Sequence, residues 1–114
     1  MSVIKYNKDM TITRYTTPTI EIDLEDGATI NGIQAFSFIV KQRGQIRVER
    51  TASKIAKGST ENSVIVKLTS SETASLNTTE RPQTQVRYRR SNGDEYATEI
   101  FEFDVLDVLK DSTI

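Results

Sequence analysis

The segment from residue 83 to residue 109 constrains the fold of this chain more than any other, because two strand-like runs flank a short turn there. The runs QTQVRYRR and EYATEIFEFDVLDVL are rich in β-branched and aromatic residues, and Ser91-Asn92-Gly93 separates them. This combination is typical of a β-hairpin. The segment therefore predicts an antiparallel sheet built around this hairpin.

Two registers of the hairpin are open. A two-residue Asn-Gly turn would place Val86 opposite Glu99. A three-residue Ser-Asn-Gly loop, with its glycine left-handed at a bulge, would pair Tyr88 with Tyr96 and Val86 with Thr98. It would also place opposite charges across from each other on the other face, Arg89 and Glu95. We expect the second register, because aromatic and opposite-charge pairs each contribute about 0.2–1 kcal/mol.

The returning strand of the hairpin changes its pattern near Ile100. Tyr96 and Ile100 share one face of a regular strand, whereas the apolar residues that follow, Phe101, Phe103 and Val105, fall on the other face. Either a β-bulge shifts the register, or both faces of the strand are covered. We expect the bulge, and we expect Phe103 in the core.

Other segments also alternate apolar and polar residues in the way that strands do; they are residues 10–15, 19–25, 33–42, 45–51 and 63–68. The segment 33–42 is the most apolar and predicts a central strand, and Glu21 is expected to face solvent. Residues 52–62 have no clear period and predict a surface loop. Thr69 and Glu72 form a capping box, which predicts one helical turn after residue 69.

The count of seven or eight short strands, with turn signals every 8–12 residues, predicts an all-β fold. We expect an antiparallel, immunoglobulin-like β-sandwich, with a small barrel as the alternative. The 114 residues are long enough for one domain with a real core. We therefore expect a single domain over residues 1–114, with terminal arms at residues 1–8 and 109–114.

The residue types present leave little room for catalysis. The chain has no histidine and no cysteine, which excludes Ser-His and Cys-His nucleophiles and the common zinc sites. Its glycines stand singly at turns rather than in a phosphate-binding motif. The acidic residues of segment 19–25 could hold a hard cation, but their alternation with apolar residues favours a solvated face. We expect no enzyme activity, no cofactor and no metal.

Net charge and hydropathy limit the classes of partner that this chain is expected to bind. The net charge is −1, so no overall field favours nucleic acid or an anionic membrane. No apolar run approaches a membrane span, and the N-terminal residues lack the apolar core of a secretory signal. Basic residues gather in the stretch 41–57 and in an arginine group at residues 87–90, and acidic residues gather at residues 21–26 and 95–107. Such segregated charges can complement a second copy or a neighbour, or they can protect edge strands from aggregation.

Three segments resemble a group of small proteins encoded by phages and prophages of gut bacteria. These segments are TITRYTTPTIEIDL, VIVKLTSSETASL and QVRYRRSNGDEYATEIFEFDVLDVLKDSTI. The residues that match are Ile12, Arg14, Thr16, Thr17, Pro18, Thr19, Leu68, Thr69, Glu72, Thr73, Gln85, Arg87, Gly93, Ala97, Thr98, Val105, Leu109, Lys110 and Ile114. The resemblance spans most of the chain apart from residues 52–62, and its motifs are structural rather than catalytic.

The resemblance implies a structural protein of the virion, associated with the tail or baseplate, that is made in the bacterial cytoplasm. It implies other virion proteins and copies of the same chain as partners. The alternatives are a capsid decoration or head-fibre protein, and a module that binds carbohydrate on the host surface through exposed tyrosines. The candidate partner contacts are Tyr6, Tyr88, Arg89, Tyr96, Leu109 and Ile114.

Overall fold

The computed structural model describes residues 3–7, 9–24, 30–51 and 55–109. Its described strands form three sheets. The first contains β1 (Val3–Lys5), β3 (Thr19–Asp23), β7 (Ser63–Lys67) and β6 (Ala56–Lys57). The second contains β5 (Gln45–Thr51), β4 (Ile33–Gln42), β8 (Gln83–Arg90), β9 (Glu95–Ala97) and β10 (Phe101–Glu102). The third pairs β2 (Thr11–Thr13) with β11 (Asp104–Leu106).

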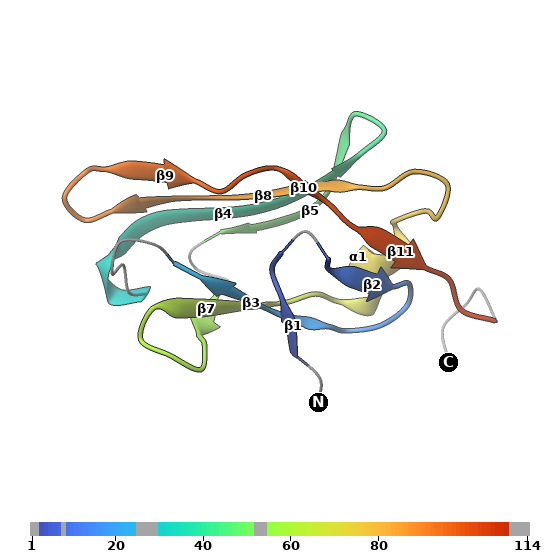
Figure 1. Ribbon diagram of the computed structural model, residues 1–114, viewed down its shortest axis with the longest axis horizontal. Helices are drawn as coiled ribbons and strands as arrows, with labels where there is room; N and C mark the ends of the chain where they lie inside the picture. The colour runs from blue at the N-terminus through green and yellow to red at the C-terminus, as the bar shows by residue number, and fades with distance from the viewer. Residues whose placement is uncertain (1–2, 8, 25–29, 52–54, 110–114) are drawn as a thin grey trace.

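The first two sheets lie as two layers, and β2 and β11 lie side by side at one end (Figure 1). In the first layer, β3–β7–β6 has the order of strands B, E and D of an immunoglobulin sandwich. In the second layer, β5–β4–β8–β10 has the order of strands C′, C, F and G. The expected all-β, immunoglobulin-like sandwich is therefore confirmed, although two of its strand pairs, β1–β3 and β2–β11, are parallel rather than antiparallel.

The hairpin has the three-residue loop and the register that the side-chain pairs predict. Tyr88 pairs with Tyr96 and Arg89 with Glu95, and the Thr98 N–H donates to the Val86 carbonyl at 2.8 Å. Gly93 has a φ of 93°, a left-handed conformation that glycine adopts without steric cost. The two tyrosine rings stack with centroids 5.2 Å apart, so this aromatic pair helps to fix the register.

The expected bulge near Ile100 is also present. Ala97 pairs with Arg87, but Phe101 pairs with Thr84, so four steps along one strand correspond to three along the other. This one-residue shift turns both Tyr96 and Phe101 toward the inside of the sandwich. Phe103 follows, fully buried between β10 and β11.

The core lies between the two layers, where the buried side chains come from both sheets and from the connection before β8. Phe38 and Val40 on β4 are fully buried, which confirms the central strand expected for residues 33–42. The other apolar members with less than 2% exposure are Ile12, Ile20, Ile22, Val64, Val66, Leu68, Leu76, Val86 and Phe103. Apolar burial of this kind is the main driving force for folding.

Several expectations about strands are wrong in detail. The segment 52–62, expected to be a loop, contains the short strand β6, which pairs with β7. Eleven strands rather than seven or eight occur among the described residues, because the bulge divides the returning strand and β1 and β6 are additional. A second bulge, beside Lys41, shifts the pairing of β5. It leaves Ile46 exposed and Val48 buried, although their spacing predicts a common face.

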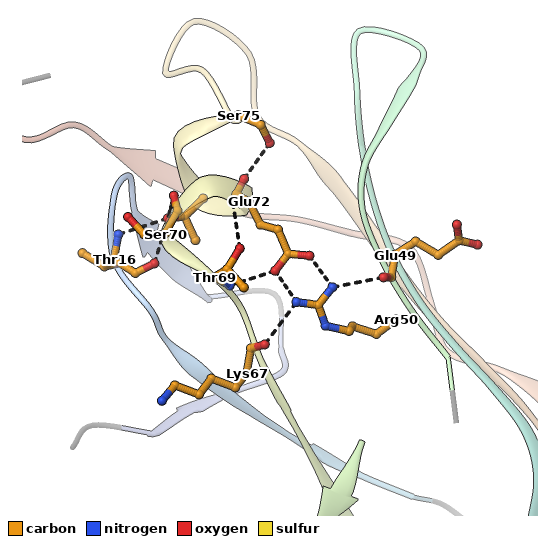
Figure 2. A network of polar contacts seen from close by, with 9 residues as sticks. Thr16, Glu49, Arg50, Lys67, Thr69, Ser70, Glu72 and Ser75 are labelled. Atoms are coloured by element: carbon orange, nitrogen blue, oxygen red, sulfur yellow. Dashed lines mark hydrogen bonds and ion pairs between the residues drawn. The ribbon is translucent and has the colours of Figure 1, made fainter. Parts of the chain in front are cut away.

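The helix α1 (Ser70–Ala74) follows β7 and begins with the expected capping box. The Thr69 hydroxyl accepts a hydrogen bond from the Glu72 N–H, and the Glu72 carboxylate accepts one from the Thr69 N–H. The same carboxylate accepts two hydrogen bonds from the Arg50 guanidinium on β5 (Figure 2). Arg50 also donates to the Lys67 carbonyl at the end of β7, so this network connects the two layers.

Candidate interaction surfaces

The hairpin residues predicted to contact a partner divide between the two faces of the sheet. Tyr88 is only 5% exposed, because the register turns it toward the core, so it is not a surface ring and this prediction is wrong. Tyr96 is half-buried against the core and stacks on Tyr88. Arg89 lies on the outer face, where its guanidinium is 3.6 Å from the Glu95 carboxylate. Of these three residues, only Arg89 is exposed, with 45% of its side chain accessible.

Tyr6, another predicted contact, connects β1 to the second layer. Its hydroxyl donates to the Thr84 carbonyl at 3.2 Å and lies 3.0 Å from the Thr98 hydroxyl. Its ring packs against Phe38 and Phe101, with centroid distances of 6.2 and 5.2 Å. Burial raises the pKa of this phenol. Tyr6 is therefore tied into the domain, and its side chain is engaged in holding the N-terminal segment.

The two terminal segments differ from each other. Within the segment 1–8, β1 pairs in parallel with β3, so its described part belongs to a sheet. At the other end, the Leu109 side chain is fully exposed, and its contact with a partner stays a prediction. Ile114 lies outside the described residues.

No described helix or strand covers the outer face of the five-stranded sheet (Figure 1). The side chains that alternate with the core positions of β4 point to it, and Ala35, Ser37 and Ile39 on this strand are half-buried. Ile39 lies opposite Gln85 on β8. A groove of about 220 Å³ runs here between Ile39 and the 58% exposed Ile100 of the bulge.

Two isoleucines and two charged side chains line this groove together with polar side chains. Lys41 and Arg87 both line it; Lys41 lies opposite Gln83 and Arg87 lies opposite Ser37, four residues further along the β4–β8 pair. Arg87 is 3.9 Å from the Glu95 carboxylate. Ile46, 57% exposed, pairs with Lys41 beyond the bulge of β5. An apolar centre with a charged rim is the arrangement found in protein–protein interfaces.

Glu21 forms a buried polar site that the sequence pattern did not predict. It lies on the expected side of β3, but it is only 5% exposed because the turn after β6 folds over it. Its carboxylate accepts hydrogen bonds from the Ser59 N–H and hydroxyl, both at 2.6 Å, and from the Ser63 hydroxyl at 3.1 Å. Lys5 on β1 completes the site with an ion pair. All its partners are donors, so this carboxylate stabilises the first sheet and holds β1 against it.

The turn that covers Glu21 depends on the absence of a side chain at Gly58. A Cβ atom there would lie 2.7 Å from the Glu21 carboxylate and closer still to the Ser63 hydroxyl. Neither the glycine nor the two serines carries a signal in the local sequence that points to residue 21, since the contacts span about forty residues.

Stability at low pH provides a test of the Glu21 site. The Lys5 ammonium, followed by the Ser59 donors, lowers the pKa of Glu21 from 4.5 to about 2. A lowered pKa stabilises the folded chain above the unfolded value, and this contribution is lost as the pH falls toward the folded value. We expect the wild-type chain to be more stable than Glu21→Gln above pH 4.5, with the difference shrinking between pH 4.5 and 2 in urea denaturation. A difference that is constant over this range would contradict the assignment.

The other predicted charge groups are dispersed. Within the basic stretch, the side chain of Arg50 pairs with Glu72, that of Lys57 pairs with Glu61, and that of Arg43 donates to the Thr79 hydroxyl. These side chains therefore point in different directions. Among the described residues, no three acidic side chains gather where a metal ion could be held. Nor is any helix in the described part long and apolar enough to cross a membrane.

Comparison with known proteins gives structural neighbours only. No family model and no curated protein matches the sequence. One similar solved structure is the immunoglobulin-like domain of mouse leukocyte-associated immunoglobulin-like receptor 1, a strand-swapped dimer, with 12% identity, a TM-score of 0.48, and coverage of 89% of this chain and 91% of that one. Another is a chicken TCR, with 12% identity, a TM-score of 0.47, and coverage of 94% of this chain and 48% of that one.

Proposed function

We propose that this chain is a non-enzymatic structural subunit of a phage virion, associated with the tail or baseplate. It acts through contacts with other virion proteins and with copies of itself. The observation that carries the contact role is the uncovered outer face of the five-stranded sheet, where Ile39, Ile46 and Ile100 lie among charged side chains.

The contact role is supported by the free energy that burying the apolar part of this face would contribute. Ile46 and Ile100 are more than half exposed, and each buried apolar Å² contributes about 25 cal/mol. Grouped apolar side chains with a polar rim mark interaction sites on soluble domains. The sandwich behind this face is held by a continuous core, so the face is presented on a rigid support.

The placement on a phage particle rests on the sequence resemblance of the three segments quoted above. The matching residues mainly have structural roles in this chain. Thr69 and Glu72 form the capping box, and Gly93 forms the hairpin turn. Tail or baseplate is the location we favour, with capsid decoration as the alternative.

Substitutions on the outer face test the proposal. In a host whose own copy is deleted and replaced, we expect the double variant Ile46→Asp, Ile100→Asp to fold and to enter purified particles about tenfold less than wild type, which corresponds to about 1.4 kcal/mol. Leu106→Asp is the matched control, because Leu106 is equally exposed but lies on β11. Normal incorporation of the double variant would refute the role of this face.

A further inference from the structure

The strand β5 has an open edge. It pairs with β4 on one side, and no described strand pairs with its other side. With seven residues it is longer than β1, β6, β9 and β10, the strands that border the remaining edges of the two layers. A free edge presents a row of backbone N–H and C=O groups that can pair with a strand from another chain.

Two charged side chains on this edge have no partner among the described residues. The Nε atom of Arg47 is buried but has no hydrogen-bond partner there. The Glu49 carboxylate is exposed and points away from the Arg50–Glu72 network (Figure 2). On the opposite edge of the same sheet, by contrast, Glu95 already lies near two arginines.

We propose that β5 pairs in antiparallel fashion with β5 of a second copy of this chain, with Val48 opposite Val48. In a twofold dimer of this kind the axis is perpendicular to the sheet, so residues that lie opposite each other share a face. With Val48 at the axis, Arg47 of each copy lies opposite Glu49 of the other. The segment QIRVERT is thus self-complementary in charge.

Charge also selects this register over its neighbours. Centring the axis on Arg47 would place two arginines opposite each other, and centring it on Glu49 would place two glutamates opposite each other. Like charges directly opposite are destabilising, whereas opposite charges contribute about 0.2–1 kcal/mol a pair. Only the Val48-centred register gives two favourable pairs.

This pairing rests on the assembly role proposed above. It identifies a second copy of the chain as one partner in the assembly. It joins two five-stranded sheets edge to edge, so that their outer faces form one continuous surface for a neighbour. In the pairing with β4, the bulge leaves Arg47 without an opposite residue, so the regular part of β5 begins at Val48. The contact is therefore short. A short contact favours association at high local concentration, as in an assembled particle.

Charge reversal tests the inference with the purified full chain in sedimentation equilibrium. We expect the wild type to dimerise reversibly, and Arg47→Glu or Glu49→Arg alone to weaken the dimer about tenfold or more. The double variant Arg47→Glu, Glu49→Arg restores both charge pairs and should dimerise again. An equimolar mixture of the two single variants should form a heterodimer, because each supplies the charges that the other lacks.

The control is Glu102→Arg on β10, at the opposite edge of the sheet, which should dimerise as the wild type does. A wild-type chain that stays monomeric up to about 1 mM, or single variants that dimerise normally, would overturn the inference. Circular dichroism melts of each variant separate lost association from lost folding. A chain that dimerises through β5 but is absent from particles would refute the proposed function and leave this inference standing.

Discussion

Replacing Phe103 with alanine is expected to destabilise the chain by about 3–5 kcal/mol. Phe103 has no exposed surface and lies where the chain passes from β10 to β11, so truncation would leave a cavity between the five-stranded sheet and the β2–β11 pair. Domains of this size are stable by about 5–15 kcal/mol in total. Urea denaturation should show a large loss of stability, or a chain that is mostly unfolded.

Changes at the exposed C-terminal end provide the control for Phe103. The free energy of unfolding of Leu109→Ala, and of a chain truncated after Val108, should lie within about 0.5 kcal/mol of the wild-type value. The reason is that the Leu109 side chain is fully exposed and does not pack in the core. If Leu109 contacts a partner, the same truncation should reduce incorporation into particles. A loss of less than about 1 kcal/mol for Phe103→Ala, well below that range, would contradict the core assignment.

Replacing Glu72 with alanine is expected to cost about 2–4 kcal/mol, the second-largest effect. About 0.5–1 kcal/mol comes from the lost hydrogen bond between the Thr69 N–H and the Glu72 carboxylate, and about 1.5–3 kcal/mol comes from the charged hydrogen bonds to Arg50. Burial alone would raise the pKa of Glu72, but the hydrogen bonds from Arg50 and the Thr69 N–H lower it overall. The carboxylate is therefore held in its charged form between the two layers.

Two variants separate the parts of this effect in thermal melts. Glu72→Gln retains an acceptor for the Thr69 N–H but loses the charge, so it should destabilise less than the alanine variant. Glu61→Ala breaks the exposed ion pair with Lys57 and should change stability by less than about 0.5 kcal/mol. A Glu72→Ala variant as stable as Glu61→Ala would show that the network contributes nothing between the layers.

The features that the sequence predicted well depend on neighbours along the chain. The hairpin register follows from the Tyr88–Tyr96 and Arg89–Glu95 pairs, which lie within ten residues of each other. The capping box needs only Thr69 and Glu72. In both cases the interacting side chains and the turn between them are read from one short segment.

The features that it missed depend on contacts between distant segments. Glu21 looks like a solvent-facing strand residue until Ser59 and Ser63 cover it from about forty residues away. The bulge in β5 lies in its pairing with β4, which the sequence of β5 does not reveal, so the strand spacing alone misplaced Ile46. The outer face itself was not predicted, because Ile39 and Ile100 come together only through the pairing of β4, β8 and the bulge.

The most direct test of the account is lysine cross-linking and mass spectrometry of intact particles from the host that encodes this chain. Lys41 lies on the outer face of the five-stranded sheet, whereas Lys67 lies on the first sheet. We predict that peptides of this chain occur in the particle and that Lys41 cross-links to another virion protein or to a second copy, more than Lys67 does. Purified particles that contain none of this chain would contradict its role as a virion subunit.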